Sequence, residues 1–176
     1  KENIIKEKFK QALVSTARVI SEDFKDKDSK GDNKNPKEFD ILNLESINSK
    51  SNLIKARAEF DSAALKKKFS SKEIFKQNLP VNSSCKSLYS IAEKIRYECL
   101  GSKMLKGIEK NLKENYKQMI NLKRKDQLKT REDVTVIEAF ELYMLKKFHK
   151  IDLNPLTKKM LNFWEKDFDK VIEKHI

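Results

Sequence analysis

The sequence predicts an all-α protein, a single bundle of about six to seven helices. Apolar residues recur at steps of three and four along most of the chain, which is the period of an α-helix. Only 3 Gly and 3 Pro occur, which leaves little turn chemistry for an all-β fold. A length of 176 residues suits one domain with a real core. We therefore treat residues 1–176 as one helical domain.

The N-terminal third contains two predicted helices and the segment between them. The first helix spans residues 4–20, with its apolar residues on one face. Residues 21–37 are rich in Asp, Lys, Ser and Asn, which predicts a flexible loop. Residues 39–44 are ambiguous, either an irregular or extended strip lying on the helices or an edge strand. The second helix is expected over residues 51–69, with Leu53 among its buried residues.

The middle of the chain begins with a helix-start signal. Residues 70–73, Ser-Ser-Lys-Glu, have the form of a capping box and predict a short helix. A longer helix follows over residues 84–100, with apolar residues on one face. We expect Ser84 to cap its start and Gly101 to end it in a left-handed conformation.

The C-terminal part continues the helical pattern. Apolar periodicity runs from residue 104 to 122, and residues 123–129 read as a charged loop. Residues 130–133 resemble another capping box. The most apolar segment, 134–148, predicts a helix packed on several sides. Asn154-Pro155 then predicts the start of one final helix.

The net charge of +12 comes from 34 Lys and 5 Arg against 27 acidic residues. Proteins that read nucleic acids rely on arginine for bidentate contacts, and arginine is scarce here. The lysines are spread along every segment among Glu and Asp, which predicts a solvated surface open to acidic partners at low salt. Nucleic acid is therefore a disfavoured partner, and a basic helical nucleic-acid-binding module is the alternative function.

Cysteine and histidine usage predicts neither a disulfide nor a zinc site. Cys85 and Cys99 would lie roughly 21 Å apart along one helix, which predicts free thiols and a cytoplasmic location. His149 and His175 are not spaced with the cysteines, so we expect surface or capping histidines. No apolar run reaches 18 residues, so no membrane span is expected.

Five charged residues on two predicted helices are the candidate site: Arg57, Asp61, Glu93, Arg96 and Glu98. They could form an interhelical ion-pair network that fixes helix register or docks a partner. Their carboxylates could instead act as general acid and base. No nucleophile, cofactor loop or metal-ligand set accompanies them, so we expect no catalytic, cofactor-binding or metal residues in this chain.

One stretch also carries a family resemblance. Residues 93–102 read Glu-x-x-Arg-x-Glu-x-x-Gly-Ser, and Met104, Gly107 and Asn111-Leu112 follow. This pattern resembles the N-terminal region of the CobT family. Segments at 9–18, 57–65 and 158–164 match in the same order, so the resemblance spans most of the chain. Ala58 replaces a family glycine, and Phe69-Ser70-Ser71 replaces a Cys-His-Asp trio.

The resemblance implies a subunit of the aerobic, ATP-dependent cobaltochelatase, a ligase that inserts Co²⁺ into hydrogenobyrinic acid a,c-diamide in cobalamin biosynthesis. It implies a non-catalytic assembly domain, with ATP, Mg²⁺ and Co²⁺ on other domains or subunits. The expected partners are the AAA+ subunit CobS and the large subunit CobN, with self-association within a ring. The family's C-terminal von Willebrand A-type domain is expected to lie outside this chain. Gly101, which matches the family pattern, joins the five charged residues as a structural or partner-docking candidate.

Overall fold

The computed structural model describes residues 2–22, 49–122, 130–172 and 174. The α-helices are α1 (Glu2–Ser21), α2 (Lys50–Phe69), α3 (Lys72–Gln77), α4 (Ser83–Met104), α5 (Lys106–Leu122), α6 (Val136–Lys147), α7 (Pro155–Asn162) and α8 (Glu165–Ile172), with a 3-10 turn over Arg131–Asp133. No strand occurs within these described ranges, and the predicted all-α class is confirmed. Among the described residues no helix is long and apolar enough to cross a membrane.

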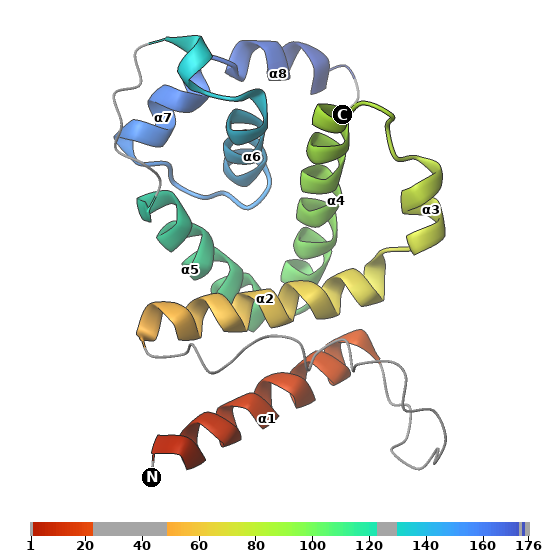
Figure 1. The fold of residues 1–176 in the computed structure, drawn as a ribbon, viewed down its shortest axis with the longest axis vertical. Coiled ribbons are helices and arrows are strands. Elements are labelled where there is room, and N and C mark those ends of the chain that lie inside the picture. The colour runs from red at the N-terminus through yellow and green to blue at the C-terminus, as the bar shows by residue number, and fades with distance from the viewer. Residues whose placement is uncertain (1, 23–48, 123–129, 173, 175–176) are drawn as a thin grey trace.

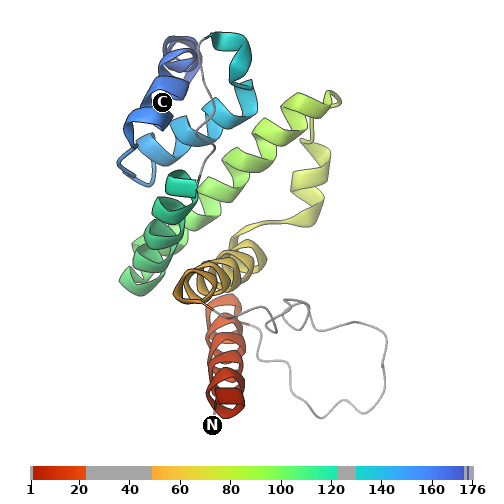
Figure 2. The ribbon, with the colours of Figure 1, turned by 60° about the vertical axis from the view of Figure 1, so that its left-hand side comes forward.

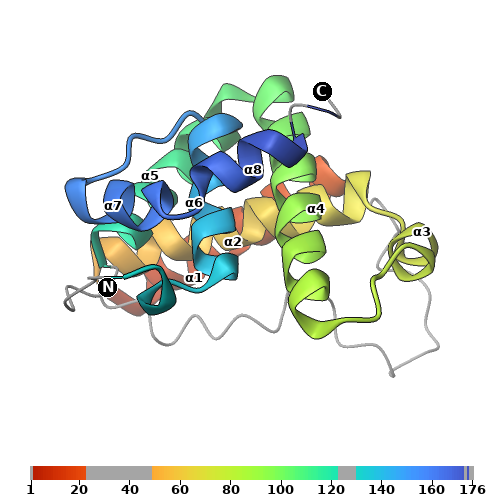
Figure 3. The ribbon, with the colours of Figure 1, turned by 90° about the horizontal axis from the view of Figure 1, so that it is seen from above.

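The helices are stacked in successive layers, with α2 between α1 and the rest of the bundle (Figures 1 and 2). On its other side α2 packs against α4 and α5, which also pack against each other. The C-terminal helices α6, α7 and α8 form the far end, where α6 contacts α4. Seen from above, α3 stands at the edge of the molecule beside the start of α4 (Figure 3).

The position of α2 explains its sequence. A helix that is covered from two sides needs apolar residues on more than one face. Phe60 and Leu65 are almost completely buried, and the small residues Ala56, Ala58 and Ala64 are buried as well. Leu53, which the sequence analysis places in the core, is 37% exposed because the buried part of α2 begins at Ala56.

Two predicted ends of α4 are wrong. The N-cap is Asn82, whose side-chain oxygen accepts hydrogen bonds from the backbone N–H groups of Ser84 and Cys85. Asparagine is as good a cap as serine, so the helix begins before Ser84 and encloses it. At the other end, Gly101 lies inside α4, which continues to Met104.

The predicted N-cap is wrong by one residue for α3 and correct for α7. The α3 cap is Ser71 instead of Ser70, because Ser71 accepts from the backbone N–H of Ile74. Asn154 caps α7 as predicted, with Pro155 as the first helical residue.

The predicted final helix is divided into α7 and α8, which gives eight α-helices in the described residues where six to seven were expected. At the break, the Trp164 indole N–H donates to the backbone oxygen of Val134 over 3.1 Å. The guanidinium of Arg131 lies 3.8 Å from the centroid of the Trp164 ring. The turn therefore places the tryptophan against the segment before α6. The predicted segment 39–44 and, apart from Ser21 and Glu22, the predicted loop 21–37 lie outside the described residues.

Candidate functional site

The most unusual polar residue in the fold is Glu98, a glutamate with no exposed surface. It lies on the buried face of α4, three residues after the core residue Ile95. Its Oε1 accepts a hydrogen bond from the Ser62 hydroxyl of α2 over 2.6 Å. Its Oε2 accepts from the Tyr116 hydroxyl of α5 over 2.5 Å. One carboxylate therefore joins three helices.

Two nitrogen atoms also approach the Glu98 carboxylate. The Nε2 of His149, in the segment after α6, lies 3.3 Å from Oε2, and the imidazole is buried. The Nζ of Lys94, one turn earlier on α4, lies 4.0 Å from Oε1. His149 was expected at the surface or as a cap, and that expectation is wrong. The chain after α6 turns inward, so His149 and its neighbour Ile151 are both buried.

The surrounding groups keep Glu98 ionised. Burial by itself raises the pKa of this carboxyl, because the charged form loses its water. His149, Lys94 and the two hydroxyl donors outweigh burial and hold the pKa below its ordinary value of 4.5. Burial and the nearby Glu98 charge raise the pKa of Tyr116 far above its ordinary value, so Tyr116 remains a proton donor. At neutral pH the centre therefore contains a buried carboxylate with two hydroxyl donors.

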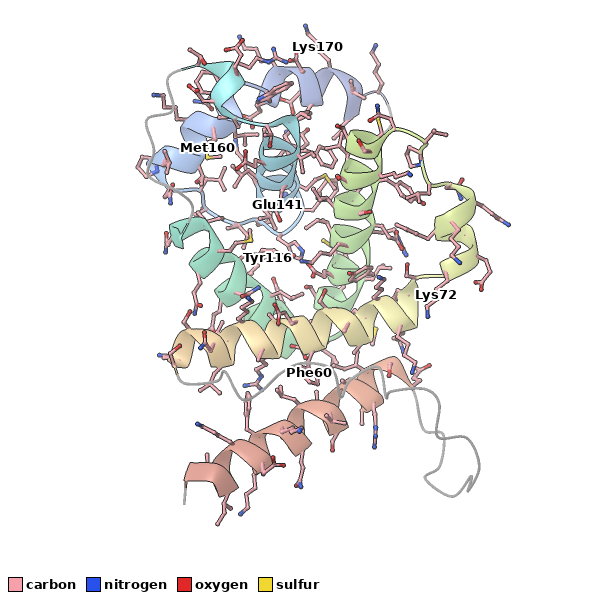
Figure 4. All side chains as sticks on the ribbon, viewed as in Figure 1. Phe60, Lys72, Tyr116, Glu141, Met160 and Lys170 are labelled. Carbon is pink, nitrogen blue, oxygen red and sulfur yellow. The ribbon has the colours of Figure 1, made fainter. Side chains whose placement is uncertain are left out.

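A hollow of about 250 Å³ opens beside this centre, between α2, α4 and α5. Buried residues form its floor, among them Ser62, Glu98 and Tyr116. Tyr116 lies on the side of α5 that is turned towards α4 (Figure 4). Lys66 and Lys94 line the hollow from the more exposed side.

Asp61 forms a second, separate polar contact. It is buried on α2 and accepts a hydrogen bond from the Asn111 side-chain amide of α5 over 2.7 Å. Burial raises the pKa of Asp61, although Asn111 and the positive charge of Arg57 oppose that change. Arg57 lies one turn earlier on α2 and is exposed. The hydrogen bond between Asp61 and Asn111 joins α2 to α5, whereas Arg57 remains on the surface.

Glu93 and Arg96 form a third cluster at the C-terminal end of α2. Arg96 Nε and Nη2 donate to the two Glu93 oxygens over 2.7 and 2.8 Å. Arg96 Nη2 also donates to the backbone oxygen of Phe69 over 2.6 Å. The Ser70 hydroxyl donates to Glu93. The hydrogen bonds from Arg96 are the main reason that the pKa of Glu93 is lowered. This ion pair of α4 thus holds the last turn of α2.

Gly101 has a packing role. A Cβ on Gly101 would lie 2.8 Å from Cγ of Leu65 and closer still to both Leu65 methyl groups. The missing side chain therefore lets α4 approach the fully buried Leu65 of α2.

The six predicted residues thus lie in three clusters and one packing contact, all at the contacts of α2 and α4 with their neighbours. Several partners of the carboxylates were not predicted, among them Ser62, Asn111 and Tyr116. Tyr116 lies on an apolar stripe, and a buried tyrosine hydroxyl needs a hydrogen-bond partner. Its position was therefore a sequence signal for a buried acceptor nearby. Within the described part of the chain, no three His, Cys, Asp or Glu side chains are grouped to hold a metal ion.

The fold and these clusters define an all-α protein whose buried carboxylates connect helices. Comparison with known families then identifies the group to which it belongs. The model of the family described as cobalamin biosynthesis protein CobT matches residues 5–176, so the chain belongs to the CobT family. The family resemblance in the sequence is thereby confirmed, and the family implies a role in cobalamin biosynthesis. Neither the curated proteins nor the solved structures gave a significant match.

Proposed function

We propose that this chain is an assembly domain of the CobT subunit of ATP-dependent cobaltochelatase. In this role it supports the insertion of Co²⁺ into hydrogenobyrinic acid a,c-diamide and has no active site of its own. The observation that carries the proposal is the family match over residues 5–176, which takes in nearly all of the helices from α1 to α8. The family model therefore matches nearly the whole helical domain.

The use of the buried and paired carboxylates supports a role in assembly. Glu98 accepts hydrogen bonds from two helices, and Glu93 is held by Arg96 and Ser70. A general acid or base must reach a proton on its substrate. These carboxylates are instead engaged in joining α2, α4 and α5, which gives partners a rigid set of helix faces.

The partners we propose are the AAA+ subunit CobS and the large subunit CobN, in the cytoplasm, with self-association within a ring. In this arrangement ATP, Mg²⁺ and Co²⁺ bind to other subunits or domains. Of the candidate docking residues, Arg57 is the most suitable because its side chain is exposed and lies beside the buried Asp61. Glu98 is unsuitable for docking because it is buried.

Size-exclusion chromatography with light scattering tests the proposal. The chain is run alone, and then with the AAA+ subunit and ATP. We expect co-elution at a defined ring stoichiometry that Arg57→Glu weakens. Lys170→Glu, the same charge reversal on α8, serves as the matched control and should leave co-elution unchanged. A second run replaces CobS with CobN. Separate elution with no change in mass in both runs would contradict the proposal.

A further inference from the structure

A groove of about 430 Å³ lies between the C-terminal half of α2 and the short helix α3. It is lined by residues of both helices: Ala63, Lys66, Lys67, Ser70, Lys72, Phe75 and Lys76. In Figure 1, α3 stands apart from the bundle at the end of α2. No residue of α3 is buried, so this helix leaves much of its surface available for contact.

The groove is strongly cationic. Four of the lining residues are exposed lysines, and no lining residue is acidic. Two nearby carboxylates already have partners. Glu73 accepts from the Ser71 hydroxyl at the start of α3, and Glu93 is bound by Arg96. The local charge therefore favours an anionic ligand.

The groove also has apolar surface, supplied by Ala63 and Phe75. Phe75 is half-buried, and its ring lies 5.1 Å from that of Tyr89 on α4. This ring contact links α3 to α4. A ligand with an apolar side chain could bury it between Ala63 and Phe75.

The groove and the hollow beside Glu98 share two lining residues. Both are lined by Ala63 and Lys66, so they adjoin along α2. The hollow adds Lys94 and two carboxylates. Glu98 lies on its buried floor and accepts from Ser62 and Tyr116. Glu59 has Lys55 as an ion-pair partner at 3.8 Å. Together the two are lined by five lysines and two carboxylates, so the net charge of the combined surface is positive.

We propose that this surface docks an acidic peptide segment of a partner protein, with one apolar side chain inserted between Ala63 and Phe75. Lysines that act as point charges suit flexible carboxylates, whereas the groove lacks the arginine fork that reads phosphates and bases. Its single aromatic ring packs against Tyr89, which makes a poor stacking platform for bases. The proposal goes beyond the proposed function, because it requires no chelatase subunit.

Fluorescence anisotropy with the full chain tests the proposal. The probes are a labelled Asp/Glu-rich peptide with a central Leu, the same peptide with Ala in its place, and a single-stranded oligonucleotide. We expect the Leu peptide to bind more tightly than the Ala peptide. We expect its affinity to fall as salt rises, because the charges involved are exposed.

Two double variants with equal net charge separate the groove from general attraction. Lys72→Glu with Lys76→Glu reverses both lysine charges of α3 and should weaken Leu-peptide binding about tenfold, because two attractive charges become repulsive. Lys166→Glu with Lys170→Glu makes the same change on α8, distant from the groove (Figure 4), and should alter binding less than about twofold.

Three results would overturn the proposal. Both double variants could lose equal affinity, or the Leu and Ala peptides could bind equally well. The oligonucleotide could also bind more tightly than the Leu peptide and lose this binding in the α3 double variant. Circular dichroism and thermal melting of each variant show whether the fold is retained. Phe75→Ala should remove the preference for Leu over Ala and keep the salt dependence. These measurements use only this chain, so they test the peptide proposal independently of co-elution with CobS. Either proposal can be contradicted while the other holds.

Discussion

Tyr116 donates its hydroxyl hydrogen to Oε2 of Glu98 over 2.5 Å, and neither side chain has more than 2% of its surface exposed. The bond connects α5 to α4 at the point where Ser62 of α2 reaches the other carboxylate oxygen. A buried carboxylate without donors would be strongly destabilising, so the three helices depend on one another here.

Tyr116→Phe should lower the free energy of unfolding by about 1–3 kcal/mol, because it removes one donor from a buried carboxylate. Tyr143→Phe is the matched control. The Tyr143 hydroxyl also donates to a carboxylate, Asp169, whose side chain is 31% exposed and can be hydrated. Its loss should cost less than about 1 kcal/mol. Urea denaturation measures both, and equal losses would show that burial of the Glu98 centre adds nothing.

Glu98→Gln should also lower the free energy of unfolding by about 1–3 kcal/mol at neutral pH. Both carboxylate oxygens accept from hydroxyl groups, and glutamine replaces one of these acceptors with an NH2 donor. The pKa of Glu98 is lowered in the folded state, so the ionised carboxylate stabilises the fold above its ordinary pKa of 4.5. This contribution is lost as the pH falls below 4.5 and through the folded pKa. The difference between wild type and variant should therefore shrink on acidification, as measured by denaturation at pH 7 and stepwise below pH 5. A constant difference would contradict this.

Asp61→Asn should show the opposite pH dependence. Burial raises the pKa of Asp61 above its ordinary value of 3.8, so ionisation in the folded state costs free energy. Asparagine avoids this cost and can still accept from Asn111. The stability of the wild type relative to the variant should thus fall as the pH rises above 3.8 and through the folded pKa. The same denaturation series measures it, and a relative gain with rising pH would refute the assignment.

Gly101→Ala should destabilise the fold by about 1–3 kcal/mol, because the new methyl group overlaps the buried Leu65 side chain. Gly107→Ala is the control. A Cβ there meets nothing within 4 Å, so the better helix propensity of alanine should leave stability unchanged or raise it by up to about 1 kcal/mol. Thermal melting separates them. Leu65→Ala should also cost less in the Gly101→Ala background than alone, and additive losses would argue against the contact.

Arg96→Lys should have a small global effect, below about 1 kcal/mol, because the Arg96 side chain is 48% exposed. Lysine cannot reproduce the three hydrogen bonds to Glu93 and Phe69. We therefore expect faster amide hydrogen exchange in the last turn of α2, near Ser70, with little change in α5. Unchanged exchange at Ser70 would show that the ion pair does not hold this turn.

The helices could be predicted because their signals are local. Apolar residues at steps of three and four, with caps such as Asn154, depend on neighbours within one or two turns. One of the errors was local as well. Asn82 and Ser84 are both good caps, and sequence alone does not rank them. Gly101 was mistaken for a helix end, because the reason for a glycine at that position lies on α2.

The all-α class and the approximate extent of the helices follow from the sequence alone. Which polar side chains meet depends on the tertiary structure. Glu98 finds its donors 36 and 18 residues away, at Ser62 and Tyr116, and the inward turn after α6 brings His149 to the same carboxylate. A buried charge must be satisfied by whatever groups packing brings to it, and packing depends on every helix at once.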